Sequence, residues 1–282
     1  MRQHLVLLAW LIAAFGLSAC APGEKIDVNE TLEELNVIDE TNLNDVYLTV
    51  ADPNEAVSYF ARAAQQTPDR IDLQRGLAQS LIRAKRNSEG ASAWTRVVSM
   101  EGATPQDRLG LADAQIRTND WENAKTTLDS VPPTVETFQR YRLEALVADA
   151  NKDWKRADSF YETAVGLTTR PARVLNNWGY SKLTRGEFVE AEKLFQDALR
   201  QDRDLFTAKN NLVLARGAQR SYTLPNVPMT QTERALLLHT LGLTAVKQGD
   251  VQTGKTLLRE AVATHPQHFE EAARALQTLE GA

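Results

Sequence analysis

Cys20 is the only cysteine in this chain of 282 residues, and its surroundings give its thiol a definite chemical context. It follows a short basic start containing Arg2 and an apolar run of 13 residues, Leu5 to Leu17. A membrane-spanning helix needs about 20 apolar residues, so this run is too short to span and fits the core of a secretory signal peptide. Because there is no second cysteine, an internal disulfide is excluded.

The residues next to Cys20 resemble a lipoprotein processing site. The apolar run ends Leu17-Ser18-Ala19-Cys20, which resembles the bacterial lipobox at each position. The resemblance implies cleavage before Cys20, lipidation of its thiol and acylation of the new amino terminus. The chain would then be anchored to a membrane without spanning it. Ala21 stands where an Asp would mark inner-membrane retention, which implies the periplasmic face of the outer membrane. The alternative is an ordinary secretory signal.

Candidate catalytic and metal-binding groups are few. His4 falls in the signal peptide, and His239, His265 and His268 lie near the end of the chain. Pro266 disrupts helical spacing between the last two, and no carboxylate or cysteine nearby in sequence completes a zinc set. The HExxH, GxSxG and P-loop patterns are missing from the sequence. We therefore expect a protein that is not an enzyme, with no metal, no cofactor and no small-molecule substrate.

The charge distribution separates an acidic leading segment from an ordinary globular body. The formal net charge of −5 gives no general reason to bind nucleic acid. Between Glu24 and Glu55, ten acidic residues accompany one lysine, a local net charge of −9. We expect residues 1–19 to be a signal peptide, residues 20–45 a disordered acidic tether and residues 46–282 the folded domain.

A regular spacing of small residues runs through the folded domain. Intervals of 34, 34, 33 and 34 residues separate the members of this series: Ala56, Gly90, Ala124, Ala157 and Ala191. Four residues after each lies a large apolar side chain: Phe60, Trp94, Leu128, Tyr161 and Phe195. Three further on lies a smaller one: Ala63, Val97, Val131, Ala164 and Ala198. This spacing places each triplet on one face of a helix.

Residues 172–205 form the clearest unit and resemble the tetratricopeptide repeat, whose period is 34 residues. Trp178 and Gly179 fall on its first helix, Gly186 in its turn and Phe195 on its second helix. Lys182 departs from the pattern, which usually has a large aromatic residue there. The resemblance implies an all-α, right-handed superhelical solenoid of about six to seven helical hairpins. Such solenoids usually bind other molecules and do not catalyse reactions.

One segment interrupts the repeat. Residues 218–229 carry Pro225 and Pro228, which prevent a normal second helix because proline lacks the amide donor and clashes in a helix interior. Thr230 and Glu233 then form a capping-box pattern that restarts a helix. The segment is either a lengthened surface loop in a decayed repeat, or an extended strand placed in the groove or offered to a partner.

The concave groove of such a solenoid is lined by positions 2, 5, 9, 12 and 13 of each first helix. These positions give the predicted protein-binding residues: Arg75, Gln79, Arg83, Asp113, Arg117, Arg142, Asn176, Tyr180, Asn210 and Leu214. Four arginines on the early units favour an acidic or carboxylate-bearing peptide, because a guanidinium presents a planar, bidentate fork. The alternative is that these side chains are solvated or form ion pairs within the stack.

Signal peptide, lipobox, acidic linker and repeats together resemble the TadD-type lipoprotein of tight-adherence (Flp) pilus systems. The stretches that carry this resemblance are NNWGYSKLTRGEFVEAEKLFQDAL and TAKNNLVLARG. It implies an outer-membrane accessory factor in pilus assembly, with the secretin or other pilus or secretion components as protein partners. Two alternatives stay open: a type IV pilotin-like secretin chaperone, and an adaptor for peptidoglycan hydrolases or synthases. A secretin gene and a traffic ATPase gene beside this one would favour the pilus assignment.

Overall fold

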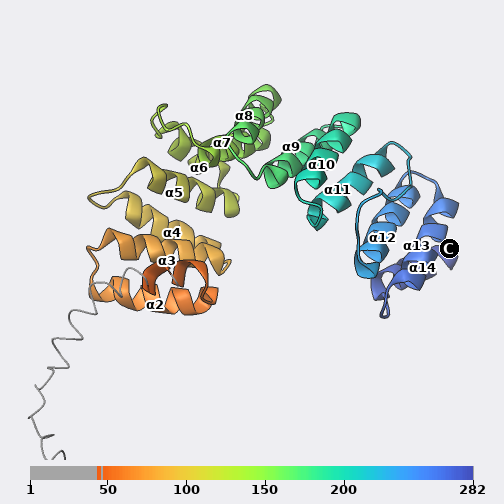
Figure 1. Ribbon diagram of the computed structural model, residues 1–282, viewed down its shortest axis with the longest axis horizontal. Helices are drawn as coiled ribbons and strands as arrows, with labels where there is room; N and C mark the ends of the chain where they lie inside the picture. Colours follow the sequence, from red (N-terminus) through yellow and green to blue (C-terminus); the bar gives the residue numbers. More distant parts are fainter. Residues whose placement is uncertain (1–42, 46, 282) are drawn as a thin grey trace, which may run out of the picture.

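Helices form the regular secondary structure of this protein. The computed structural model describes residues 43–45 and 47–281, and over these residues it contains helices and no strands. The predicted signal peptide, Cys20 and the tether up to residue 42 lie outside the described residues. After a short helical segment within residues 43–49, the helices follow one another along an arch (Figure 1). Their bounds are α2 (Pro53–Gln66), α3 (Ile71–Arg83), α4 (Asn87–Val98), α5 (Pro105–Arg117), α6 (Trp121–Asp129), α7 (Phe138–Ala150), α8 (Trp154–Gly166), α9 (Ala172–Thr184), α10 (Phe188–Gln201), α11 (Phe206–Ala218), α12 (Gln231–Lys247), α13 (Val251–Thr264) and α14 (Glu270–Glu280).

Neighbouring helices pack in pairs, each pair burying the face that the sequence pattern predicts. The pairs are α3 with α4, α5 with α6, α7 with α8, α9 with α10, and α12 with α13. The four alanines of the small-residue series are completely buried, and Gly90 is buried as well. The large apolar members are buried too, with exposed fractions between 0% and 6%. The predicted all-helical stack of hairpins is therefore confirmed.

Glycine allows close helix approaches at several points in the stack. A Cβ atom on Gly179 would lie 2.7 Å from the Phe195 ring, which packs from α10 onto α9. A Cβ on Gly110 of α5 would lie 2.7 Å from the Trp94 ring of α4. Real Cβ atoms do not approach carbon this closely, so these two rings occupy space that only glycine leaves free.

The turns inside the hairpins share one backbone conformation. Gly186 has a φ of +83°, as its place in the predicted turn requires. At the corresponding turn positions, Lys85, Asn119, Lys152 and Arg220 have φ between 59° and 61°, in the left-handed region that non-glycine residues enter at a cost. The turn recurs even at Arg220, so the unit that begins at α11 keeps its first helix and turn and then loses its second helix.

The interrupting segment packs over the side of the stack formed by α10 and α11. Val227 contacts the apolar cluster that contains Leu199 of α10 and Leu212 of α11, and Pro225 is buried. Leu224 packs against the next cluster, which belongs mainly to α12 and α13. The segment thus covers surface that a second helix would cover. Its end matches the sequence prediction, because Thr230 and Glu233 form a capping box at the start of α12.

A buried ion pair also joins α11 to α12. The Lys209 ammonium is 1% exposed and lies 3.1 Å from a carboxylate oxygen of Glu233, the same residue that caps α12. At the end of the stack, α14 packs Ala272 against the cluster of α12 and α13 and covers the last hairpin. None of the helices described here is both long enough and apolar enough to cross a membrane.

Candidate functional site

The four predicted groove arginines are engaged inside the stack. Arg75 holds both carboxylate oxygens of Asp107 at 2.7 Å and also donates to the Gly102 carbonyl. Arg117 and Arg142 share Asp113, at 2.6 and 2.7 Å. These contacts correspond to the alternative interpretation of the sequence, in which the arginines form ion pairs within the stack.

Arg83 has a different role from the other three. Its guanidinium donates to the carbonyls of Tyr47, Leu48 and Ala51, at distances from 2.7 to 3.0 Å. Tyr47 in turn stacks on Tyr59 of α2, with ring centroids 4.2 Å apart. Arg83 therefore holds the end of the short first helical segment against α2 and α3.

The early hollow is a depression of about 530 Å³ on the first helices of the early units. The predicted residues Arg75, Gln79 and Asp113 line it. Burial alone would raise the pKa of Asp107, but bonds from Arg75 and Thr104 outweigh it and hold that pKa below its usual value. The same balance, with bonds from Arg117 and Arg142, lowers the pKa of Asp113. The charges of this hollow are thus largely matched by partners within the chain.

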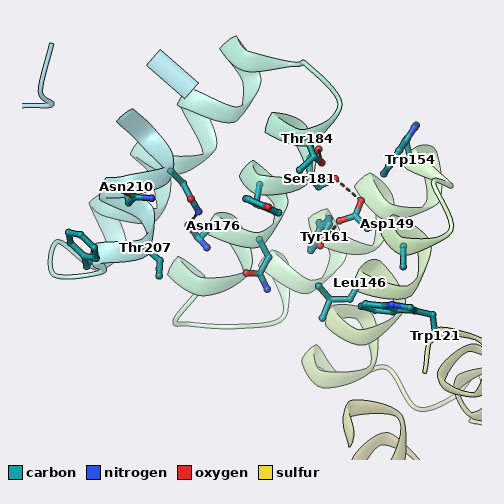
Figure 2. Close-up of a pocket in the computed structure, with 15 residues that line it drawn as sticks. Trp121, Leu146, Asp149, Trp154, Tyr161, Asn176, Ser181, Thr184, Thr207 and Asn210 are labelled. Atoms are coloured by element: carbon teal, nitrogen blue, oxygen red, sulfur yellow. Dashed lines mark hydrogen bonds between the residues drawn. The ribbon is translucent and has the colours of Figure 1, made fainter. Parts of the chain in front are cut away.

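The central pocket is a second depression, of about 570 Å³, formed mainly by α7, α8, α9 and α11. The predicted residues Asn176, Tyr180 and Asn210 line it. Figure 2 shows Asn176, Asn210 and Thr207 on one side of the pocket, and Leu146, Trp121 and Trp154 on the other. Further lining residues are Asp149, Ala150, Tyr161, Asn177, Ser181, Thr184, Phe206 and Asn211.

Asp149 joins three helices at the wall of the central pocket. Its carboxylate accepts a 2.7 Å bond from the Tyr161 hydroxyl of α8 and a 2.6 Å bond from the Ser181 hydroxyl of α9 (Figure 2). Burial raises the pKa of Asp149 in spite of these two bonds and the Arg185 charge, which lower it, and the nearby Asp158 carboxylate adds to the rise. Burial and the Asp149 charge likewise raise the pKa of Tyr161.

Arg185 and Lys182, which follow Ser181 in the chain, form ion pairs with other carboxylates. Arg185 pairs with Asp158, lies 3.3 Å from Glu187 and stacks over the Trp154 ring at 5.4 Å. Lys182, at the position where the repeat usually has an aromatic residue, lies 2.9 Å from Asp158 and 2.7 Å from Glu187. Asp149 is therefore the one charged side chain lining the central pocket over the described residues, and hydroxyls are its hydrogen-bond partners.

Asparagine pairs one repeat apart line the opposite wall. Asn176 and Asn177 on α9 recur as Asn210 and Asn211 on α11. The Asn211 amide donates to Asn176 at 3.0 Å, and the Asn210 side chain accepts from Thr240 at 2.9 Å. These contacts fix Asn176, Asn210 and Asn211 in place next to the aromatic residues of the pocket.

Sequence reasoning missed several lining residues whose signals were present. In the unit 138–171, Leu146, Asp149 and Ala150 occupy groove positions and line the pocket, but Arg142 is the one groove residue predicted from that unit. Trp121 and Trp154 begin the second helices of two consecutive units, 33 residues apart, at a position that is not assigned to the groove. Their shared place directly after the turn is the signal that would find them.

The interrupting segment lies away from the central pocket. Thr207, Asn210 and Asn211 of α11 line the pocket, whereas Leu212 and Arg216 of the same helix face the segment across a separate hollow of about 680 Å³. At 3.6 residues per turn, the two sets project from nearly opposite sides of α11. The interpretation that this segment lies in the groove is therefore wrong at the central pocket.

The histidines near the end of the chain do not form a ligand cluster. The His265 ring bonds to the backbone of Gln267, and His268 lies 2.9 Å from Glu270. His239 packs against Phe269. Over the part of the chain that the structure describes, no group of three histidine, cysteine or carboxylate side chains is placed to hold a metal ion.

Solved structures with a similar fold are tetratricopeptide-repeat proteins and complexes. The APC/C hetero-tetramer Cut9–Hcn1 aligns with a TM-score of 0.61 and 15% identity. The alignment covers 90% of the present chain but only 52%, about half, of the matched chain in that complex. A tetratricopeptide repeat protein from Parabacteroides merdae aligns at 0.55 with 12% identity, over 89% of this chain and 98% of the other. Human IFIT1, solved as a dimer with PPP-AAAA, aligns with a TM-score of 0.55 and 11% identity, over 80% of this chain and 59% of the IFIT1 chain.

No protein-family model matches the sequence, and no curated protein matches it. At the identities found among solved structures, the similarity establishes the fold alone. The chain forms a tetratricopeptide-repeat solenoid, as its 34-residue period predicts.

Proposed function

We propose that this protein is a lipid-anchored periplasmic scaffold that binds protein partners in the groove formed by its first helices. The observation that carries the proposal is the central pocket, a hollow of about 570 Å³ lined by aromatic rings and by amides at one-repeat spacing. Apolar walls with a few placed polar groups are typical of ligand sites. The fold supports it as well, since Cut9 was solved in complex with Hcn1.

The pocket is better suited to an extended peptide segment than to a folded surface or a nucleic acid. Asn177 and Asn211 lie one unit apart, and their side chains offer both donors and acceptors to a peptide main chain. Trp121, Trp154 and Phe206 supply apolar area for side chains. A phosphate backbone would meet the Asp149 carboxylate with no free cation in the lining, so a nucleic acid is disfavoured.

The finer assignment rests on the sequence around Cys20 and on resemblance to the TadD-type lipoprotein. In this proposal, Cys20 carries the lipid on the periplasmic face of the outer membrane, and the scaffold helps to assemble or localise a tight-adherence pilus secretin. Replacing Cys20 by Ser should move the protein from the membrane pellet to the soluble fraction. Unchanged fractionation would refute lipidation as the attachment.

Partner capture from outer membranes tests the groove and the pilus role together. The lipidated wild-type chain should recover the secretin, and Tyr180→Ala should reduce recovery several-fold, because Tyr180 is a half-exposed ring at the pocket. Val189→Ala is the matched control, since Val189 is 66% exposed on α10 and lies outside the pocket lining. Recovery of wall hydrolases without secretin would instead favour the adaptor alternative. Normal secretin assembly in a deletion strain would overturn the pilus role.

A further inference from the structure

We infer that the central pocket binds a basic side chain, lysine or arginine, of the partner segment, with Asp149 as its counter-charge. This inference rests on the proposed function and names the ligand chemistry of that site. It reverses the expectation from the groove arginines, which favoured an acidic peptide.

The predicted groove arginines are already engaged within the stack. The arginines that would attract an acidic peptide already hold Asp107, Asp113 or backbone carbonyls, with bond lengths of 2.6 to 3.1 Å. Recruiting them for a ligand would break these bonds and leave the carboxylates of the stack unpaired. Arg117 and Arg142 share one carboxylate and Arg83 donates to neutral carbonyls, so the four arginines keep a net positive charge, but the donors that they use within the stack are not available to an acidic partner.

The Asp149 carboxylate is held by hydroxyl groups and keeps acceptor sites for a ligand. Each of its oxygens accepts one hydroxyl, from Tyr161 or Ser181, and retains a further lone pair. Arg185 and Lys182 are occupied by Asp158 and Glu187. The Arg185 charge favours this carboxylate from a distance, but among the described residues no cation forms an ion pair with it, and an incoming ammonium or guanidinium would supply one.

Aromatic side chains line the pocket beside the Asp149 carboxylate. Trp154 and Trp121 lie on the same side of the pocket as Asp149 (Figure 2). Lysine and arginine have apolar stems and charged ends, so aromatic walls beside a carboxylate match both parts of the side chain. Tryptophan is also the best aromatic partner for a cation, and the Arg185 guanidinium already lies over the Trp154 ring, 5.4 Å from its centroid.

Three other ligands fit these observations less well. A metal ion would need further charged ligands, and none joins Asp149 among the described lining residues. An acidic side chain would be repelled by Asp149. A purely apolar side chain would fill the aromatic part but leave the carboxylate unpaired on a dehydrated wall.

The test is a peptide selection followed by a double-mutant cycle. A random-peptide library is panned against the full-length wild-type chain in detergent. The best binder is then synthesised with blocked ends, once unchanged and once with its lysine or arginine replaced by norleucine or citrulline. Neutralising that residue should weaken binding about tenfold or more. Asp149→Asn should weaken binding of the unchanged peptide by a similar factor and leave the neutralised peptide unaffected.

The matched control is Glu162→Gln, which removes one negative charge from an exposed position of α8 that does not line the pocket. It should change neither affinity. Selected peptides that lack lysine and arginine, or equal losses for both peptides in Asp149→Asn, would overturn the basic-residue inference while leaving groove binding intact. A library that yields no binder sensitive to Tyr180→Ala would overturn the proposed function itself, and this inference with it. The peptide replacements decide the question even where a protein variant is unstable.

Discussion

Arg75 and Asp107 lie 32 residues apart in the chain, and the guanidinium of one holds both oxygens of the other at 2.7 Å. The pair links α3 to the start of α5, where Asp107 also completes a capping box with Thr104. One side chain thus caps its own helix and joins it to the preceding unit.

Replacing Asp107 by Asn should lower the free energy of unfolding by about 2–3 kcal/mol, because a charge-assisted pair and a cap are lost together. The pKa of Asp107 is lowered in the folded chain, so its contribution is present above the unfolded pKa and is lost as the pH falls through the folded value. The stability gap between wild type and variant should therefore narrow below about pH 4 in denaturant titrations. Exposed Asp69→Asn is the control, and an equal loss there would contradict the assignment.

Lys152→Gly should stabilise the protein by about 0.5 kcal/mol, because Lys152 has a left-handed backbone that glycine adopts without a steric penalty. The reciprocal change, Gly186→Lys at the equivalent turn, should destabilise it by about 1 kcal/mol. Thermal unfolding measures both. Shifts of the same sign would show that the turn backbone is not the cause.

Gly179→Ala should destabilise the stack by about 1–3 kcal/mol, because the new methyl group must displace the Phe195 ring. Gly166→Ala is the matched control: a Cβ at Gly166 meets nothing within 4 Å, and the residue ends α8. There, alanine should be neutral or stabilising by about 0.5 kcal/mol. Equal effects of the two substitutions would refute the packing explanation.

Asp149→Asn should keep or raise stability at neutral pH. The pKa of Asp149 is raised by burial, so Asp149 is protonated more readily in the folded chain than in the unfolded chain, and wild-type stability falls as the pH rises from the unfolded pKa through the folded one. The groups acting on it are Tyr161, Ser181, Arg185 and Asp158. Asp158→Asn should instead destabilise the protein, because Asp158 pairs with Arg185 and Lys182. Melting curves from pH 4 to 8 compare the two variants, and a fall in stability for Asp149→Asn would contradict this account.

Much of the fold could be predicted because the repeat is a local, one-dimensional pattern. Small residues such as Ala191 and large ones such as Phe195 recur once per unit, and each fixes one helix contact. The path of the segment before Thr230 could not be predicted in the same way. Its position depends on Val227 meeting Leu199 and Leu212, which are contributed by two different helices.

The candidate site was predicted only in part, because the ion-pair partners of its arginines come from neighbouring units. The helix positions of Arg75 and Arg142 predict that they lie near the groove. Whether they are available to a ligand depends on Asp107 and Asp113, the carboxylates of neighbouring units with which they form ion pairs. Side chains 29 to 32 residues apart meet only when the units stack in the right register. Trp154 enters the pocket from a second helix, which position rules for first helices do not consider.

The bridge at Asp149 has a consequence for the curvature of the arch. Its carboxylate is held by one hydroxyl from its own hairpin, at Tyr161, and by one from the next, at Ser181. If a ligand in the central pocket binds more tightly at one angle between these hairpins than at another, its binding shifts the curvature of the arch, and the curvature shifts its affinity by the same free energy.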